Sequence, residues 1–413
     1  MSAHNTVRFI IYSLLIFAPL ARASVRDWAL CVIHIMTLLA FTVFLLDRAY
    51  RRDWNRIKTP LDVPLSALLC LCTVSTLFSV HPYAGIRALM LLLNYIVIFY
   101  LAVHTVRTRS CFRQTVYVIS GMGIFLSVFG FMKQSGINPF PWWEYSDIGQ
   151  NSVRLSATYG NPDHLAGYME MVLPLISAFL LTGYFAGIKK LLFIYTAIFM
   201  FTALMLSLSR GGWIGFAAGM LFMLFCFFRL KKTGKKWFFL FMAGILTALI
   251  IFLASTPAVE RFLTIPVQKE MTMEARLAAW RGVLDMIGDY PLLGSGPGTF
   301  ADIFTQYQPP GLTAQFKNAH NDYLHFTSET GILLIPLMVW IIFVFYKTGF
   351  EKAKSQSRLY RSISIGTMGG ISAMLVHSIG DFNLHIPANA LLFSVLAGLA
   401  VSPLPKHRSS AGK

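Results

Sequence analysis

Residues 28–46 read WALCVIHIMTLLAFTVFLL, an apolar run without a lysine, arginine, aspartate or glutamate. A transmembrane helix needs about 17–25 such residues to cross the hydrocarbon core of a bilayer. Comparable runs recur along the whole chain, at 8–21, 28–46, 63–80, 86–104, 115–133, 165–187, 190–208, 211–228, 237–254, 331–346, 363–380 and 387–402. The sequence therefore predicts an all-α polytopic membrane protein with about 12 transmembrane helices.

The composition supports the same class of protein. The chain has 413 residues, of which 56% are hydrophobic and 13% are charged. Soluble domains carry about 25% charged residues, so an ordinary soluble fold is excluded. The formal net charge of +17 indicates membrane orientation and contact with anionic membrane lipids, and we expect no nucleic-acid partner.

The basic residues alternate from one predicted loop to the next, as expected when lysine and arginine collect on the cytoplasmic side. With the N-terminus inside, the basic cytoplasmic segments contain Arg8; Arg48, Arg51, Arg52, Arg56 and Lys58; Arg107, Arg109 and Arg113; Lys189 and Lys190; Arg229, Lys231, Lys232, Lys235 and Lys236; Lys347, Lys352, Lys354, Arg358 and Arg361; and Lys406, Arg408 and Lys413. Both termini are then cytoplasmic. The N-terminus resembles a signal peptide with a possible cleavage site at 21–23, but we expect an uncleaved first helix.

This topology divides the chain into three parts. Residues 1–254 hold the first nine helices, 255–330 form a long loop domain on the outer side, and 331–413 hold the last three helices and a cytoplasmic tail. Within the loop, 273–287 has an apolar stripe at the helical period. Arg276 and Arg281 flank that stripe and project about 140° apart, so one of them can serve a site while the other faces elsewhere.

The same topology gathers polar residues on the outer side. They are Arg154, Arg210, Arg276 or Arg281, His320 and Asp381. Arginine offers a permanently charged fork of donors that suits phosphate or diphosphate, and histidine can accept a proton from a hydroxyl near neutral pH. Simpler interpretations stay open: Arg210 can pair with a carboxylate, Gly211 and Gly215 can serve helix packing, and 294–298 can be a plain turn.

No familiar metal or nucleotide motif accompanies these residues. The chain lacks an Asp-x-Asp pair and a nucleotide-binding loop. Four histidines, His320, His325, His377 and His385, could approach one another, but their spacing matches no common zinc pattern. We therefore expect neither a metal nor a cofactor.

Several short motifs together resemble one family. They are Arg154 with Gly160-Asn161-Pro162, Ser209-Arg210-Gly211, Arg276-Leu277-Ala278-Ala279-Trp280, Pro291-Leu292-Leu293-Gly294, His320-Asn321 followed by Gly331, and Asp381 after the eleventh span. Across roughly residues 150–390 this set resembles the bacterial O-antigen ligases and their polymerase relatives.

The resemblance implies a GT-C-like, metal-independent membrane glycosyltransferase of the bacterial inner membrane. Such an enzyme moves a glycan, with inversion, from undecaprenyl diphosphate to a sugar hydroxyl of lipid A-core at the periplasmic face. His320 is then the general base and Asp381 orients or balances the charged groups. The diphosphate is held by Arg210 and Arg276, with Arg154 and Arg281 as further candidates. Asn321, Asp322 and Glu329 support the site.

Two alternatives remain open. The ligase pattern continues with glycine, threonine or tyrosine three residues after the glycine, and here Leu334 stands there. A polysaccharide polymerase or a protein O-oligosaccharyltransferase of the same superfamily is therefore the first alternative. A secondary transporter is the second, but transporters bind substrate near the bilayer midplane, where Glu170 is the main ionisable residue of this chain.

Overall fold

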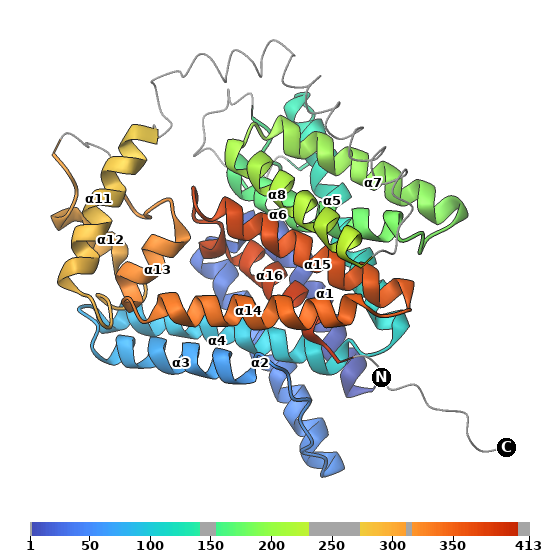
Figure 1. Cartoon of the computed structure of the whole chain (residues 1–413), viewed down its shortest axis with the longest axis horizontal. Helices are drawn as coiled ribbons and strands as arrows, with labels where there is room; N and C mark the ends of the chain where they lie inside the picture. Colours follow the sequence, from blue (N-terminus) through green and yellow to red (C-terminus); the bar gives the residue numbers. More distant parts are fainter. Residues whose placement is uncertain (1, 141–153, 231–272, 311–315, 404–413) are drawn as a thin grey trace.

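The computed structural model describes residues 2–140, 154–230, 273–310 and 316–403, and within these ranges it contains helices and no strand (Figure 1). The helices are α1 (Ala3–Leu20), α2 (Asp27–Arg51), α3 (Asp62–Leu77), α4 (Pro82–Thr105), α5 (Arg109–Gln134), α6 (Pro162–Leu181), α7 (Gly187–Leu206), α8 (Arg210–Arg229), α11 (Met273–Asp289), α12 (Phe300–Ile303), α13 (Asp322–Thr330), α14 (Leu334–Ala353), α15 (Arg358–His377) and α16 (Pro387–Val401). Short 3-10 turns are η1 (Arg22–Ser24), η3 (Phe304–Gln306) and η4 (Asn383–His385).

Each predicted span that falls on described residues coincides with a helix, whereas the one at 237–254 lies outside them. In the described part of the chain, eight helices are long and apolar enough to cross a membrane, namely α1, α2, α4, α5, α6, α7, α8 and α14. The apolar helices α3 and α16 are shorter, with 16 and 15 residues. An all-helical polytopic membrane protein is therefore confirmed, while the number twelve stays a prediction.

The helix α15 contains more polar residues than a typical membrane-spanning helix, and its packing explains how they are accommodated. It lies against α6 and α8, and most of its length is buried. Its buried hydroxyls donate to backbone carbonyls within the protein, as Ser364 Oγ does to Gly349 O at 2.6 Å and Thr367 Oγ1 does to Ile363 O at 2.7 Å. Because protein rather than lipid surrounds this helix, its polar residues cost little.

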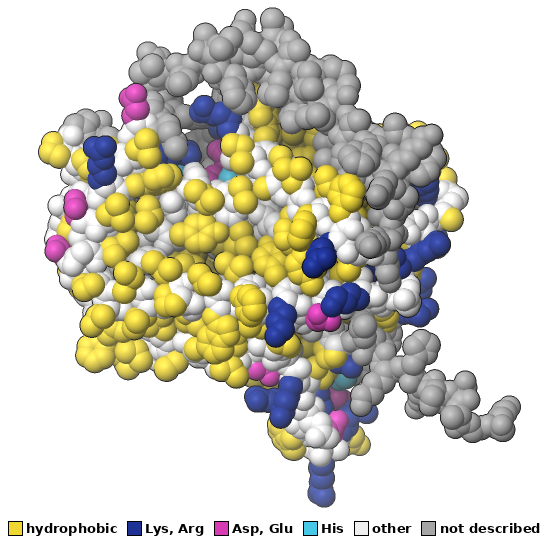
Figure 2. Space-filling model, in the orientation of Figure 1, with side chains coloured by type: hydrophobic (Ala, Val, Ile, Leu, Met, Phe, Trp, Pro, Cys, Tyr) yellow, Lys and Arg dark blue, Asp and Glu magenta, His cyan; other side chains and the backbone are white. Residues whose placement is uncertain are grey.

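Among the described residues, contacts at the two ends of the helix bundle join loops that are predicted to share a side of the membrane. At one end, the α1–α2 turn reaches α4 through Asp27 and Arg87 at 2.6 Å, and the α3–α4 turn reaches α12 through His81 and Asp302 at 2.8 Å. At the other end, Arg8 donates to Thr105 O at 3.1 Å. Figure 2 shows a broad apolar surface between these ends, with most of the visible Lys and Arg side chains away from α11–α13.

The segment α11–α13 has a small apolar core of its own, at the end of the bundle beside α3, α4 and α14 (Figure 1). Its buried members are Ala279, Val283, Met286, Phe300, Phe304, Phe316 and Ala319. The loop at 294–298 joins α11 to α12 and packs on the C-terminal end of α13, where Ser295 N donates to Ser328 O at 3.0 Å. Three of its glycines have positive φ, which glycine adopts freely, so this loop is a structural turn.

Candidate active site

The site centres on a histidine that precedes α14 in the sequence and an aspartate that follows α15. His320 Nδ1 lies 3.6 Å from Asp381 Oδ1. The aspartate side chain is almost completely buried, whereas the histidine side chain keeps 18% of its surface exposed. Burial alone would raise the pKa of Asp381, but the interaction with His320 and the imidazoles of His164 and His377 lower that pKa below its ordinary value. Asp381 is therefore an ionised partner for His320.

The local sequence explains how His320 reaches this position. Asn321 is the N-cap of α13, and its Oδ1 accepts a hydrogen bond from Leu324 N at 3.1 Å. Directly before the cap, His320 has φ +49, in the left-handed region that a histidine adopts more readily than most side chains. The turn directs the ring toward Asp381 and Phe382, whose ring centroid lies 4.9 Å away. Asn321, expected as a supporting residue, thus acts on the backbone.

Asp322 links the start of α13 to the segment 378–385 that contains Asp381. Its backbone N donates to Ser378 O at 2.9 Å and to Asp381 O at 3.2 Å. Its buried carboxylate accepts from Ser378 Oγ at 2.7 Å, from Leu384 N at 3.0 Å and from His385 Nδ1 at 2.6 Å. Burial would lower the pKa of His385, but the hydrogen bond and charge of Asp322 raise it. The residue holds the segment 378–385 against the start of α13.

The two arginines of α11 occupy different faces, and only one points into the site. Arg276 Nη1 donates to Gly380 O at 2.7 Å, next to Asp381. Its Nε is buried and has no hydrogen-bond partner among the described residues. Arg281 is exposed on the outward surface of the helix. A buried, unpartnered guanidinium N–H beside the site is a donor available to a ligand.

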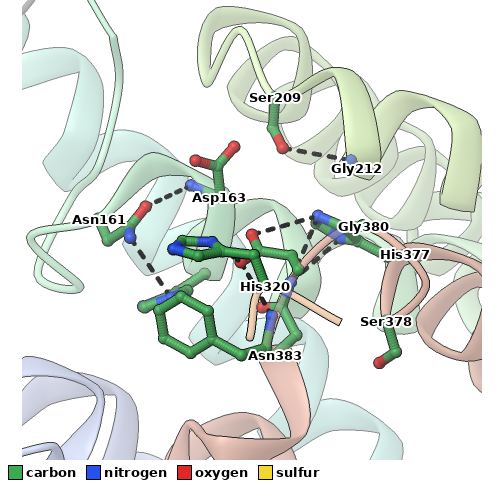
Figure 3. A network of polar contacts seen from close by, with 12 residues as sticks. Asn161, Asp163, Ser209, Gly212, His320, His377, Ser378, Gly380 and Asn383 are labelled. Atoms are coloured by element: carbon green, nitrogen blue, oxygen red, sulfur yellow. Dashed lines mark hydrogen bonds and ion pairs between the residues drawn. The ribbon is translucent and has the colours of Figure 1, made fainter. Parts of the chain in front are cut away.

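Arg210 and Arg154 differ in whether other residues of the protein already bind the side chain. Arg210 is the first residue of α8, which is capped by Ser209 through a hydrogen bond from Gly212 N at 3.2 Å (Figure 3). Arg210 is exposed and forms no ion pair with the part of the chain that the structure describes. Arg154, in contrast, reaches Asp163 Oδ1 at 2.6 Å and Ser207 O at 2.9 Å. Arg154 therefore holds two loops together, and Arg210 remains open to an anion.

A second polar group extends the site into the bundle. His377, at the end of α15, lies with Nε2 3.7 Å from Asp381 Oδ2 and with Nδ1 3.0 Å from Glu170 Oε1 on α6. Asn383 Nδ2 lies 3.3 Å from the same ring (Figure 3). In the sequence, His377 is one of four histidines without a common zinc spacing and Glu170 is a midspan ionisable residue, and no pattern indicates that the two meet.

Glu329 lies away from this centre, in a second group with His325 and His385. These three could offer ligands to a metal ion, since their donor atoms all lie within 4.8 Å of one another. However, Ala319 N donates to His325 Nδ1 at 3.4 Å, which leaves the proton of a neutral ring on Nε2, 3.2 Å from Glu329 Oε1. Burial lowers the pKa of His325, so the ring is neutral. A ring with Nε2 protonated does not fit a metal ligand.

Glu329 and His325 instead hold the loop that precedes α12. Glu329 Oε1 also accepts from Phe300 N at 3.0 Å, and the ring of His325 stacks on Phe300 at 4.4 Å. Of the two histidines in the 319–325 stretch, the structure brings His320, and not His325, next to Asp381. The expected support by Glu329 is thus indirect, through the packing of α12 against α13.

Comparison with known proteins gives one match. Residues 195–339 match the family model described as O-Antigen ligase. The matched region includes α8 with Arg210, α11 with Arg276, and the stretch that carries His320. A search of curated proteins finds no match. The match supports the family that the sequence motifs resemble.

Proposed function

We propose that this chain, a member of the O-antigen ligase family, transfers a glycan from a lipid diphosphate carrier to an acceptor hydroxyl. The observation that carries the proposal is the pair formed by His320 and Asp381, with Arg276 bound to the neighbouring Gly380 O. The start of α8, which carries Arg210, packs on His377 through Gly211. A base with an ionised partner, next to a guanidinium group whose Nε–H has no partner among the described residues, is suited to a reaction in which a hydroxyl loses a proton and a diphosphate gains charge.

The geometry assigns the two nitrogens of His320 different tasks. Nδ1 faces Asp381, so the carboxylate favours the tautomer with a proton on Nδ1 and leaves the lone pair on Nε2. In the transfer step, Nε2 accepts the acceptor's hydroxyl proton as the oxygen forms a bond to the anomeric carbon. The bond from that carbon to the diphosphate breaks on the opposite face, which inverts the anomeric centre. Asp381 stabilises the imidazolium that forms.

The arginines act on the leaving group. Arg276 is anchored to Gly380 O through Nη1, which leaves its buried Nε available to a phosphate oxygen. Arg210 adds a charge at the N-terminus of α8, where the backbone also favours an anion. Arg154 is engaged with Asp163 and Arg281 is directed outward, so we assign them no direct contact with the diphosphate.

The finer features of the proposal follow the family. The carrier is undecaprenyl diphosphate, the acceptor is a sugar hydroxyl of lipid A-core, and the reaction needs no metal. The fold is of the GT-C type in the bacterial inner membrane, with both termini cytoplasmic and the end that carries α11–α13 in the periplasm. Residues 255–330 act as the loop domain between the membrane parts 1–254 and 331–413. Leu334 is 3% exposed at the start of α14, so it shapes helix packing rather than acceptor choice.

The test is glycan transfer by purified protein in detergent, with an undecaprenyl diphosphate-linked glycan, lipid A-core and a chelator. We expect modified lipid A-core with the wild type, and a loss of at least about 10³-fold with His320→Ala, which removes the base. His81→Ala is the matched control, because His81 is an exposed histidine of the same end of the bundle.

Other outcomes separate the alternatives. Lengthening of the glycan on its carrier, without modified lipid A-core, would identify a polymerase with the same chemistry. Activity that the chelator abolishes would overturn metal independence. Near-normal transfer by His320→Ala would remove His320 as the base, and absence of any transfer by folded wild-type protein would refute the glycosyltransferase.

A further inference from the structure

Glu170 is a completely buried carboxylate in a membrane helix, with no exposed surface. Ionisable groups at such depth are expensive, and they are retained where they pair or serve a function. One oxygen, Oε1, lies 3.0 Å from His377 Nδ1. The other, Oε2, is buried and has no hydrogen-bond partner among the described residues. The interaction with His377 is therefore the main compensation for this charge.

His377 carries a carboxylate at each ring nitrogen. Glu170 lies at Nδ1, and Asp381 Oδ2 lies 3.7 Å from Nε2. The other oxygen of Asp381 faces His320. Contacts thus run from Glu170, in the interior of the bundle, through His377 and Asp381 to His320, the proposed base. We name these four residues the buried chain.

The helix α8 leaves room for the buried chain through two glycines. A Cβ atom added at Gly211 would lie 2.5 Å from Cδ2 of His377, and one added at Gly215 would lie 2.6 Å from Oε2 of Glu170. A third glycine of the same spacing, Gly219, meets only the backbone and a methyl group of α15. The sequence pattern suggests helix packing alone, but two of its three glycines accommodate ionisable side chains.

We propose that Glu170 and His377 are positioning residues that tune the proton affinity of His320 through Asp381. The proposal rests on His320 being the base of the proposed function. His377, between two carboxylates, is an imidazolium that donates Nδ1–H to Glu170 and Nε2–H to Asp381. Its positive charge offsets part of the attraction of Asp381 for a proton on His320.

The offset matters because a buried carboxylate alone would hold its histidine partner protonated. A protonated His320 cannot accept the hydroxyl proton, so Asp381 alone would move the active range to higher pH. With His377 charged, Asp381 still orients Nδ1–H of His320 but attracts a proton on Nε2 less strongly. When Nε2 accepts the proton from the acceptor hydroxyl, two carboxylates balance two imidazoliums.

Other charged groups also face the buried chain. Asp163 and His164 lie at the start of α6, and Arg276 on α11 reaches Gly380. Arg210 is exposed at the start of α8, next to Gly211, which packs on His377. These groups are left unchanged in the variants proposed below. A change in the pH profile can therefore be assigned to Glu170 and His377.

The experiment is the pH dependence of transfer for the wild type, Glu170→Gln, His377→Gln and the double variant. His377→Gln removes the imidazolium itself. Glu170→Gln leaves Asp381 as the one carboxylate shared by His377 and His320, and one carboxylate does not keep both rings protonated. We expect the acidic limb of the rate profile to move to higher pH by about one unit in each single variant. The double variant has the same shift as each single one, since both act through one group. Glu351→Gln, exposed at the other end of the bundle, is the matched control.

Two kinetic results would overturn the proposal. The first is a lower rate at every pH with an unmoved acidic limb, which would indicate a purely structural role. The second is an additive shift in the double variant, because independent effects would exclude one linked chain. If the wild type transfers no glycan, the proposed function fails, and the state of His377 is tested separately.

That second test needs only folded protein, the wild type and His377→Gln. Solid-state NMR with ¹⁵N-labelled histidine at about pH 8, where an ordinary histidine is neutral, reports an imidazolium directly. We expect an imidazolium in the wild type whose ring protons correlate with both an aspartate and a glutamate carboxylate. Its loss in His377→Gln distinguishes it from a signal of His385, which lies beside Asp322 and Glu329. Absence of this imidazolium from the wild type would overturn the proposal whatever the activity.

Discussion

Replacement of Asp322 by alanine removes the hydrogen bonds that link the start of α13 to the segment 378–385. The Asp322 side chain is 1% exposed, and its carboxylate accepts three hydrogen bonds, from Ser378 Oγ, Leu384 N and His385 Nδ1. Asp322→Ala leaves all three donors without their acceptor in a buried place. Since these donors lie on both sides of Asp381 in the sequence, the change loosens the segment that holds Asp381 beside His320.

The size of the effect follows from the contacts. A hydrogen bond to a charged group contributes about 1.5–3 kcal/mol, and breaking a buried pair by removing one partner costs about 3–5 kcal/mol. Because water can reach part of the His385 side chain, which is 22% exposed, we expect a loss of about 3–5 kcal/mol in the free energy of unfolding. A displacement of Asp381 by about 1 Å also lowers the transfer rate about 100-fold.

Denaturant unfolding in detergent, followed by tryptophan fluorescence, measures the first effect, and the transfer assay measures the second. Asp285→Ala is the control, because Asp285 is exposed on α11, and we expect a change within about 0.5 kcal/mol. Asp322→Ala with a stability loss below about 1 kcal/mol and unchanged transfer would refute the linking role of Asp322.

The same variant also changes the pH dependence of stability. Asp322 raises the pKa of His385 above its ordinary 6.5 in the folded protein. A raised folded pKa stabilises the protein fully below the unfolded pKa, and this contribution is lost as the pH rises through the folded pKa. The stability difference between wild type and Asp322→Ala is therefore largest below pH 6.5 and shrinks above it. A difference that grows with pH would contradict this assignment.

Two further predictions compare matched pairs. Arg276→Ala lowers the transfer rate by about 100-fold, since it removes a donor proposed to stabilise the leaving diphosphate. Arg281→Ala, the control, leaves the rate within about twofold. Equal losses of rate in the two variants would contradict the conclusion that Arg276, and not Arg281, faces the site. Gly215→Val destabilises the protein by about 1–3 kcal/mol through overpacking, because the added Cβ would lie 2.7 Å from a backbone oxygen of α15. Gly121→Val is the control and has a small effect, because nothing lies within 4 Å of a Cβ at that position. Thermal unfolding of the two glycine variants in detergent is the measurement, and equal unfolding temperatures would refute it.

Part of the candidate site could be predicted from the sequence because it depends on short-range features. The stretch around His320, the arginine of the α8 start and the aspartate after α15 each stand at the end of an apolar run. Alternating basic loops place such ends on one side, and the structure does bring Asp381 next to His320. The sequence could not predict which of the candidate site residues already interact with other parts of the protein. Arg154 is engaged by Asp163, and Asn321 serves as a helix cap.

The buried chain shows a second limit. Glu170 and His377 are separated by 207 residues in the sequence, and no periodicity connects them. Their meeting depends on how α6, α8 and α15 pack, and glycines at 211 and 215 allow that packing. The sequence also suggests that the polar helix α15 spans the membrane like the others, whereas its hydroxyls are satisfied inside the protein.

The sequence by itself determined the class of the protein, the helix positions in the described ranges, the alternation of its basic loops and the resemblance to the O-antigen ligase family. These follow from hydropathy, local charge and short motifs, all of which act over a few residues. Only the tertiary structure decided that Arg276 rather than Arg281 faces the site, that His320 rather than His325 meets Asp381, and that Glu170 reaches His377. Such choices depend on helix rotation and close packing between distant segments, which local sequence does not encode.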